Sequence, residues 1–184
     1  MARTDSLGES LQNKRSGLVK KWLGVLLDTY SDQAAEFMRS KTNRFDNPVG
    51  TTLRSSLEKL FDLLVTGFDP DQAAGVLDGI VRIRAIQDFP ASDSLAFIFQ
   101  LKDLLRSELG PLATQDQWAE DFQRLLLDID RMALLAFDLY VACRNQLADI
   151  RIKEVERQNH MAWRRAGMLE EAAENNKLET GDAI

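Results

Sequence analysis

Apolar residues recur three and four positions apart along most of this chain, which is the spacing of one face of an α-helix. Helix start signals divide its first half: Ser6 with Glu9 has the form of a capping box, and Ser31 precedes a short apolar series. Asn47 and Asp69 each stand before a proline, a residue favoured at the first helical position. We therefore predict four helices before residue 90, the third of which ends at Gly67. The inner face of the second is expected to carry Ala34, Phe37 and Met38.

Two more helices follow the break at Phe89-Pro90, because the residue before a proline is pushed out of the α region. The first of them ends at Gly110-Pro111. Its inner positions are expected to be Leu95, Phe99, Lys102 and Leu105. The last helix opens on a capping box at 114–117, and its apolar series, Phe137 included, meets no Gly or Pro until residue 167. About 50 residues of helix would be about 75 Å long, more than twice the width of such a domain. We predict an all-α bundle with a long projecting C-terminal helix.

The apolar stripe of this last helix is broad up to Leu147 and narrow beyond it. The narrow part consists of Ile152, Val155, Ala162, Ala166 and Leu169. A narrow stripe suits one partner helix, so we predict a homodimer with this stripe as a contact, and folding back onto the bundle is the alternative. The net charge changes from positive over 151–165 to negative over 166–184, which permits an antiparallel pair, whereas the like-charged halves of a parallel pair would face each other and weaken it. We divide the chain into a bundle (1–147), a linker-like helix (148–174) and a disordered tail (175–184).

Composition places the chain among single-domain proteins that fold without disulfides or metals. Its 184 residues include 23 Lys and Arg against 29 Asp and Glu, a formal charge of −6, and 45% are apolar. A lone cysteine cannot form an internal disulfide, which favours the reducing cytoplasm. The apolar runs are far shorter than the ~20 residues that cross a bilayer, and no signal-peptide pattern opens the chain. We therefore expect a cytoplasmic protein without membrane insertion.

The residue types that catalysis requires are sparse. Nucleophilic catalysis needs a histidine beside its nucleophile, and the single histidine, His160, is 17 residues from the single cysteine, Cys143. Along one helix that separation is about 25 Å, so the two cannot meet within one subunit. We expect Cys143 to be a buried small hydrophobe and His160 a solvated side chain. Asp128 and Asp130 point to different faces of a helix, and the sequence has no Glu-x-x-His pair for a di-metal site. We predict no enzymatic activity, metal or cofactor.

One polar cluster, within residues 81–89, is a candidate binding site. Arg84 and Asp88 are four residues apart and can pair across one helical turn. If the pair is exposed, it contributes little to stability. If it is buried, it either orients a helix end or lines a pocket. Two interpretations stay open: a structural ion pair, or a site for a small apolar or anionic ligand formed by Arg84, Asp88 and Phe89.

Two motifs resemble a known family. Residues 83–92 read Ile-Arg-Ala-Ile-Gln-Asp-Phe-Pro-Ala-Ser, and residues 44–50 read Arg-Phe-Asp-Asn-Pro-Val-Gly. Together with Ala96-Phe97 and Leu101-Lys102, they are similar to the N-terminal domain of RsbR-type (RsbRD-like) co-antagonist proteins, over roughly residues 10–110. The resemblance implies a globin-like helical domain without haem that serves as a sensory or regulatory input. In that family the domain usually precedes a STAS domain, for which we expect too few residues after the bundle here.

The resemblance implies a non-enzymatic regulatory module of stress-response signalling that binds a protein partner or a small ligand. Haem of the globin type is held by a histidine within the helical body, and His160 lies beyond it, so no haem is expected. An accessory role in a redox complex of sulfur metabolism is the alternative function. Nucleic-acid binding is a further alternative and would use the cations of the last helix, although the acidic body would repel the phosphate backbone. These cations are Arg151, Lys153, Arg157, Arg164 and Arg165.

Overall fold

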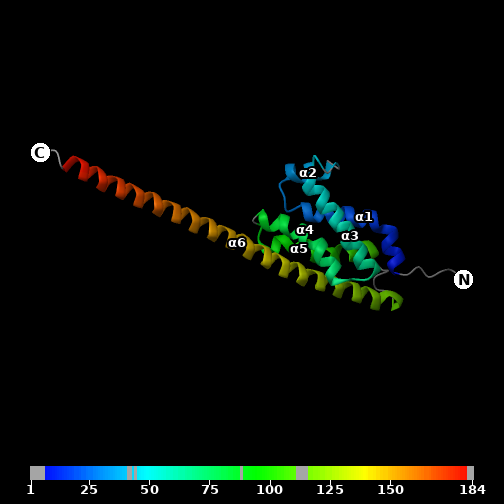
Figure 1. Cartoon of the computed structure of the whole chain (residues 1–184). Helices are drawn as coiled ribbons and strands as arrows, with labels where there is room; N and C mark the ends of the chain where they lie inside the picture. The colour runs from blue at the N-terminus through cyan, green and yellow to red at the C-terminus, as the bar shows by residue number, and fades with distance from the viewer. Residues whose placement is uncertain (1–6, 41–42, 44, 88, 111–115, 182–184) are drawn as a thin grey trace. The chain divides into compact units, whose positions relative to one another are not determined.

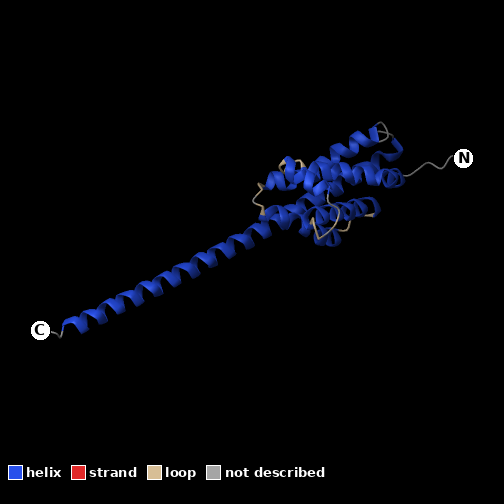
Figure 2. Ribbon diagram, turned by 90° about the horizontal axis from the view of Figure 1, so that it is seen from above, coloured by secondary structure: helices blue, strands red, loops and turns tan. Residues whose placement is uncertain are grey.

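The computed structural model describes residues 7–40, 43, 45–87, 89–110 and 116–181, and within the last helix it describes side chains from 118 to 167. This part of the chain forms six helices, which are labelled in Figure 1. They are α1 (Leu7–Leu27), α2 (Asp32–Ser40), α3 (Pro48–Thr66), α4 (Pro70–Ile86), α5 (Ala91–Leu109) and α6 (Asp116–Gly181). Figure 2 shows helices joined by loops, and no strand occurs among the described residues. The all-α prediction, with its long C-terminal helix, is confirmed.

The predicted caps at the starts of α2, α3 and α4 are confirmed. The Ser31 hydroxyl accepts the backbone N–H of Ala34 at 3.4 Å, and Asp69 accepts those of residues 71 and 72 at 2.9 and 3.1 Å. Asn47 accepts the backbone N–H of Gly50 at 2.8 Å and donates from Nδ2 to the Met38 carbonyl at 3.0 Å. Each bond satisfies a backbone group that the helix itself leaves without a partner. The predicted capping partners Ser6 and Thr114 lie outside the described residues.

The ends of α3 and α5 require glycine. Gly67 and Gly110 follow these helices with φ of +138° and +52°, a backbone conformation that L side chains rarely adopt. Gly67 also donates its N–H to the Leu63 carbonyl at 3.0 Å, which uses one of the carbonyls left over at the helix end. Both helices end at the glycines that the sequence predicted.

The core of the bundle is centred on α1, which packs against α3 and α5, while α4 packs against α3 and α5. Trp22 on α1 is fully buried, and its indole N–H donates to the carbonyl of Phe97 at 2.7 Å. A buried indole needs such a partner, because an unpaired N–H away from water costs free energy. Leucines supply much of the rest of the core, and the fully buried ones include Leu26, Leu53, Leu57, Leu60 and Leu101.

Three phenylalanines that we expected inside are about half exposed, and those predictions are wrong. Phe37, Phe99 and Phe137 expose 48%, 51% and 49% of their surface. In α5 the interior positions belong to Phe97 and Ile98 instead. Successive helix positions are rotated by about 100°, so a difference of one residue in the assumed inner face moves a side chain from the core to its edge.

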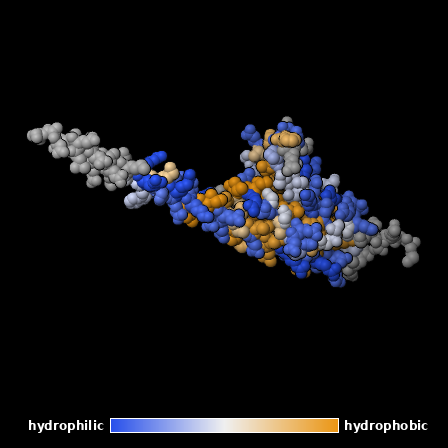
Figure 3. All heavy atoms as spheres, viewed as in Figure 1, coloured by the Kyte–Doolittle hydropathy of each residue, from blue (hydrophilic) through white to orange (hydrophobic). Residues whose placement is uncertain are grey.

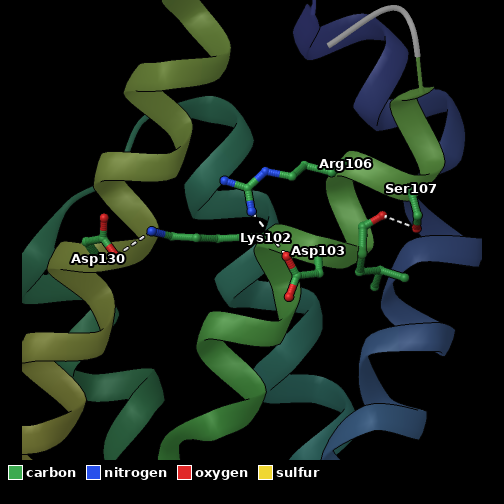
Figure 4. A network of polar contacts seen from close by, with 6 residues as sticks. Lys102, Asp103, Arg106, Ser107 and Asp130 are labelled. Atoms are coloured by element: carbon green, nitrogen blue, oxygen red, sulfur yellow. Dashed lines mark hydrogen bonds and ion pairs between the residues drawn. The ribbon is translucent and has the colours of Figure 1, made fainter. Parts of the chain in front are cut away.

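The chain divides into two units, residues 1–143 and 144–184, and α6 contributes to both. Within the first unit, Figure 4 shows Lys102 of α5 directed at Asp130 of α6, where the two side chains form an ion pair. Within the second unit, α6 includes 175–181, a stretch that we expected to lie in a disordered tail. In the part of the chain that is described, no helix has the length and hydropathy required to span a bilayer.

Candidate functional site

The candidate site is built around Arg84, which lies in the last turn of α4 and has no exposed surface. A cation is favoured at this end of a helix, because the backbone carbonyls there carry partial negative charge. Complete burial is unusual for arginine, which is normally buried only when its charge is paired. The surroundings of the guanidinium therefore decide what this residue can do.

The guanidinium joins three elements of the bundle. Its Nη2 donates to the Thr29 hydroxyl at 2.9 Å and to the backbone carbonyl of Asp93 at 2.6 Å. Thr29 follows the end of α1, and Asp93 lies in the first turn of α5. Arg84, at the end of α4, thus contacts the end of α1 and the beginning of α5 through neutral oxygen atoms.

Two aromatic rings enclose the same charge. The guanidinium carbon lies 4.6 Å from the ring centroid of Phe89 and 5.5 Å from that of Tyr30. The two rings contact each other edge to face, with centroids 5.2 Å apart. Both distances to the cation lie within the ~6 Å range of cation–π attraction, which stabilises the charge in place of water.

Part of the guanidinium lacks hydrogen-bond partners. Among the described residues no acceptor is within reach of Arg84 Nε or Nη1. Burial lowers the pKa of Arg84, and the nearby Tyr30 and Asp93 oppose that shift. Burial also raises the pKa of Tyr30, and the positive charge of Arg84 opposes this shift. The site therefore presents two buried donors that an acceptor atom, above all a negatively charged one, would satisfy.

Asp88, the predicted partner of Arg84, lies outside the described residues. Phe89 does lie beside Arg84, as the candidate site required. Thr29 and Tyr30 also belong to the cluster, and sequence reasoning missed them because they come from a distant helix end. Their only signal in the sequence is their position directly after α1.

The backbone carbonyl of Phe89 connects this cluster to α6. It accepts a hydrogen bond from the Tyr140 hydroxyl at 2.6 Å and a longer one from the Ser94 hydroxyl at 3.5 Å. Tyr140 is a buried residue of α6 within the first unit. Four helices therefore meet around Arg84 and Phe89: α1, α4, α5 and α6.

An open hollow of about 500 Å³ lies next to the cluster. Tyr30 and Gln87 line it, and the Tyr30 hydroxyl donates to Gln87 Oε1 at 2.7 Å. The rest of its lining comes from α2 and the start of α3, including Phe37, Met38 and Val49. Tyr30 lines this hollow, and its ring also contacts the guanidinium of Arg84. The Tyr30 side chain therefore connects the hollow to the buried cation.

The other residues singled out from the sequence are scattered. Cys143 is buried, as expected, and His160 is exposed. Asp128 pairs with Arg131 at 2.8 Å and exposes 15% of its side chain, and Asp130 pairs with Lys102. No three acidic, histidine or cysteine side chains in the described part of the chain gather as metal ligands.

The second unit contains the predicted dimer stripe, and four of its five side chains are described. Ile152 and Val155 expose 56% and 55% of their surface, and Ala162 and Ala166 are exposed as well. The side chain of Leu169 lies outside the described residues. Among the five cations of this helix, Arg157 is engaged by Glu154 at 2.9 Å.

Comparison with known proteins identifies the family. Residues 16–155 match the RsbT co-antagonist protein rsbRD N-terminal domain. An uncharacterized protein of Archaeoglobus fulgidus is 27% identical over 107 residues, which cover 56% of this chain and 67% of the relative. No solved structure matches the chain. The matched region contains the whole Arg84 cluster and more than half of the chain, and the chain therefore belongs to the family of the rsbRD N-terminal domain.

Proposed function

We propose that this protein is a non-enzymatic signal-input module that responds to a small ligand or a protein partner and passes the response along α6. Membership in a family of regulatory input domains supports the regulatory role. The observation that carries the proposal is the hydrogen bond from Tyr140 to the Phe89 carbonyl, because it joins the Arg84 cluster to α6.

Arg84 and Phe89 are the proposed ligand contacts. A buried cation is costly when two of its donors lack partners among the described residues, and a ligand that supplies acceptor atoms would remove part of that cost. Such a ligand would enter from the hollow at Tyr30 and Gln87 and would separate these two side chains. Any displacement of Phe89 would change the hydrogen bond that Tyr140 makes, and with it the position or dynamics of α6.

The first experiment is native mass spectrometry of freshly purified protein. We expect a mass above the 20.8 kDa of the chain, which returns to the chain mass on denaturation. The Arg84→Met variant should lose the bound mass, while Arg82→Met on the exposed side of the same helix should keep it. A retained ligand that is indifferent to Arg84 would contradict the proposed contacts.

Hydrogen exchange tests the connection to α6. Removal of the bound molecule from the wild-type protein should change amide exchange in α6, and Tyr140→Phe should reduce that change. Lys102→Met is the matched control, because it removes a different contact between α5 and α6 and leaves the Tyr140 bond intact. An equal response in all three proteins would show that Tyr140 does not transmit the signal.

The absence of enzymatic activity is part of the proposal and needs its own test. The purified protein should show no turnover in a general hydrolase screen without added cofactors. Activity that falls in a Cys143→Ser variant would support an enzyme instead, since Cys143 is the one thiol of the sequence. We further propose that the module acts as a homodimer through the exposed stripe of α6, together with a downstream protein partner.

A further inference from the structure

A second cleft, separate from the Arg84 cluster, lies among α1, α2 and α3. Its volume is about 380 Å³, which is near the lower end of the ~300–1,000 Å³ of small-molecule sites. Val19, Leu23 and Gly24 of α1 form an apolar part of its lining. Gly24 contributes directly to the open space, because nothing lies within 4 Å of the point where a Cβ would be.

The remaining lining is strongly basic. The described residues around the apolar part include four cations, Arg15, Lys20, Arg39 and Arg54, against one carboxylate, Glu58. This gathering of positive charge runs against the composition of the chain, whose formal charge is −6. An apolar surface beside concentrated positive charge suits a molecule that is itself apolar at one end and anionic at the other.

Two of the four cations already form ion pairs. Arg15 forms a two-fold ion pair with Asp62, with its nitrogens 2.6 and 2.7 Å from the carboxylate oxygens. Arg39 pairs with Asp28 at 2.9 Å. Within the described part of the chain no ion pair engages Lys20 or Arg54, and Arg54 donates only to the backbone carbonyl of Arg39. These two side chains are therefore available to an external anion.

We infer that this cleft binds a small amphiphilic anion, with a single carboxylate between Lys20 and Arg54 and a compact apolar body against Val19, Leu23 and Gly24. The inference goes beyond the proposed function, because it assigns a second site that shares no lining residue with the Arg84 cluster. The carboxylate gains charge-assisted hydrogen bonds, and the apolar body leaves water.

Octanoate is a suitable probe, with octanol and octylamine as neutral and cationic analogues of the same chain length. Isothermal titration of the full chain should show saturable binding of octanoate, weaker binding of octanol and none of octylamine. Loss of one cation in Lys20→Gln or Arg54→Gln should weaken octanoate binding about tenfold. Lys59→Gln is the control, because it removes an exposed cation of α3 that does not line the cleft.

A second pair of variants fills the cleft without touching its charges. Gly24→Leu places a side chain into the open space, and it should abolish octanoate binding. Gly17→Leu is the matched control on the same helix, since Gly17 is exposed, has equal free space and does not line the cleft. Both changes replace a helical glycine by a better helix former, so both proteins should fold.

The outcomes separate this site from the proposed function. Octanoate binding that survives Gly24→Leu, or that octanol equals, would overturn the inference, as would a failure of octanoate to bind at millimolar concentration. Arg84→Met should leave octanoate binding unchanged. Octanoate binding that is lost in Arg84→Met and retained in Gly24→Leu would place the anion at the Arg84 cluster and would also overturn the second site.

Discussion

Burial and charge oppose each other at Arg84. The buried guanidinium contacts two aromatic rings and two neutral oxygens in place of water. Two of its nitrogens lack acceptors among the described residues. Replacement of buried charged groups by apolar side chains of similar size is often neutral or stabilising. An apolar side chain of similar size would stabilise the fold as well as Arg84 does. We therefore interpret Arg84 as a functional residue.

The first prediction follows from that conflict. Arg84→Met should leave the free energy of unfolding within about 1 kcal/mol of the wild-type value or raise it, as measured by urea denaturation. Arg84→Ala should lower it by about 2–5 kcal/mol, because it leaves a cavity. A loss above about 3 kcal/mol in Arg84→Met would show that the guanidinium is a structural tie.

Tyr30 gives a second prediction, through pH. Its folded-state pKa is raised above the ordinary value of 10.0, so the unfolded chain releases the phenol proton first. The unfolded state then binds fewer protons than the folded state, and stability falls as the pH rises from about 10 through the folded pKa. Thermal unfolding across this range should show the loss in wild-type protein and a smaller loss in Tyr30→Phe. An equal loss in both proteins would assign it to other groups.

The junction of α2 and α3 depends on Asn47 and Gly50. Asn47 is almost fully buried, and its amide bonds both to α2 at Met38 and to the first turn of α3. A Cβ on Gly50 would lie 2.4 Å from Asn47 Nδ2, so any other residue at position 50 must displace the Asn47 side chain from its capping position.

The third prediction uses this geometry. Gly50→Ala should lower the free energy of unfolding by about 1–2 kcal/mol, because the displaced cap is worth more than the gain in helix propensity. Gly75→Ala in α4 should raise it by up to about 1 kcal/mol, since nothing lies within 4 Å of its new methyl group. The opposite signs are measurable by thermal or urea unfolding. A stabilised Gly50→Ala would contradict the close contact.

Helix ends were easier to predict from the sequence than helix faces. Asn47, Asp69, Gly67 and Gly110 act through local backbone chemistry that depends only on near neighbours, and each lies where it was expected. Phe37 and Phe99 depend on where other helices pack, which periodicity does not specify. The same limit applies to the site, because Thr29 reaches Arg84 across 55 residues of sequence.

At the scale of the whole molecule, α6 connects the bundle to a segment with an exposed apolar stripe. Two interleaved series each repeat every seven residues, as in a coiled coil. One series is Ile152, Asn159 and Ala166, and the other is Ala148, Val155 and Ala162. A polar residue such as Asn159 within such a series fixes the register of a pair of helices. In a parallel pair, Arg151 would also face Glu156 of the second copy, so the individual positions favour the parallel arrangement over the antiparallel one.

The last prediction is a homodimer held by this stripe. Light scattering at micromolar concentration should give twice the chain mass for the full chain, and Val155→Glu should give a monomer, because the charge would be buried at the contact. Lys153→Glu, on the solvent side of the same turn, should remain a dimer. In a Cys143→Ser background, Val155→Cys should form a disulfide between copies under mild oxidation, since a parallel pair brings the two positions together. A monomeric full chain, or a dimer that persists after deletion of 150–184, would exclude this contact, and a dimer without the disulfide would exclude the parallel arrangement.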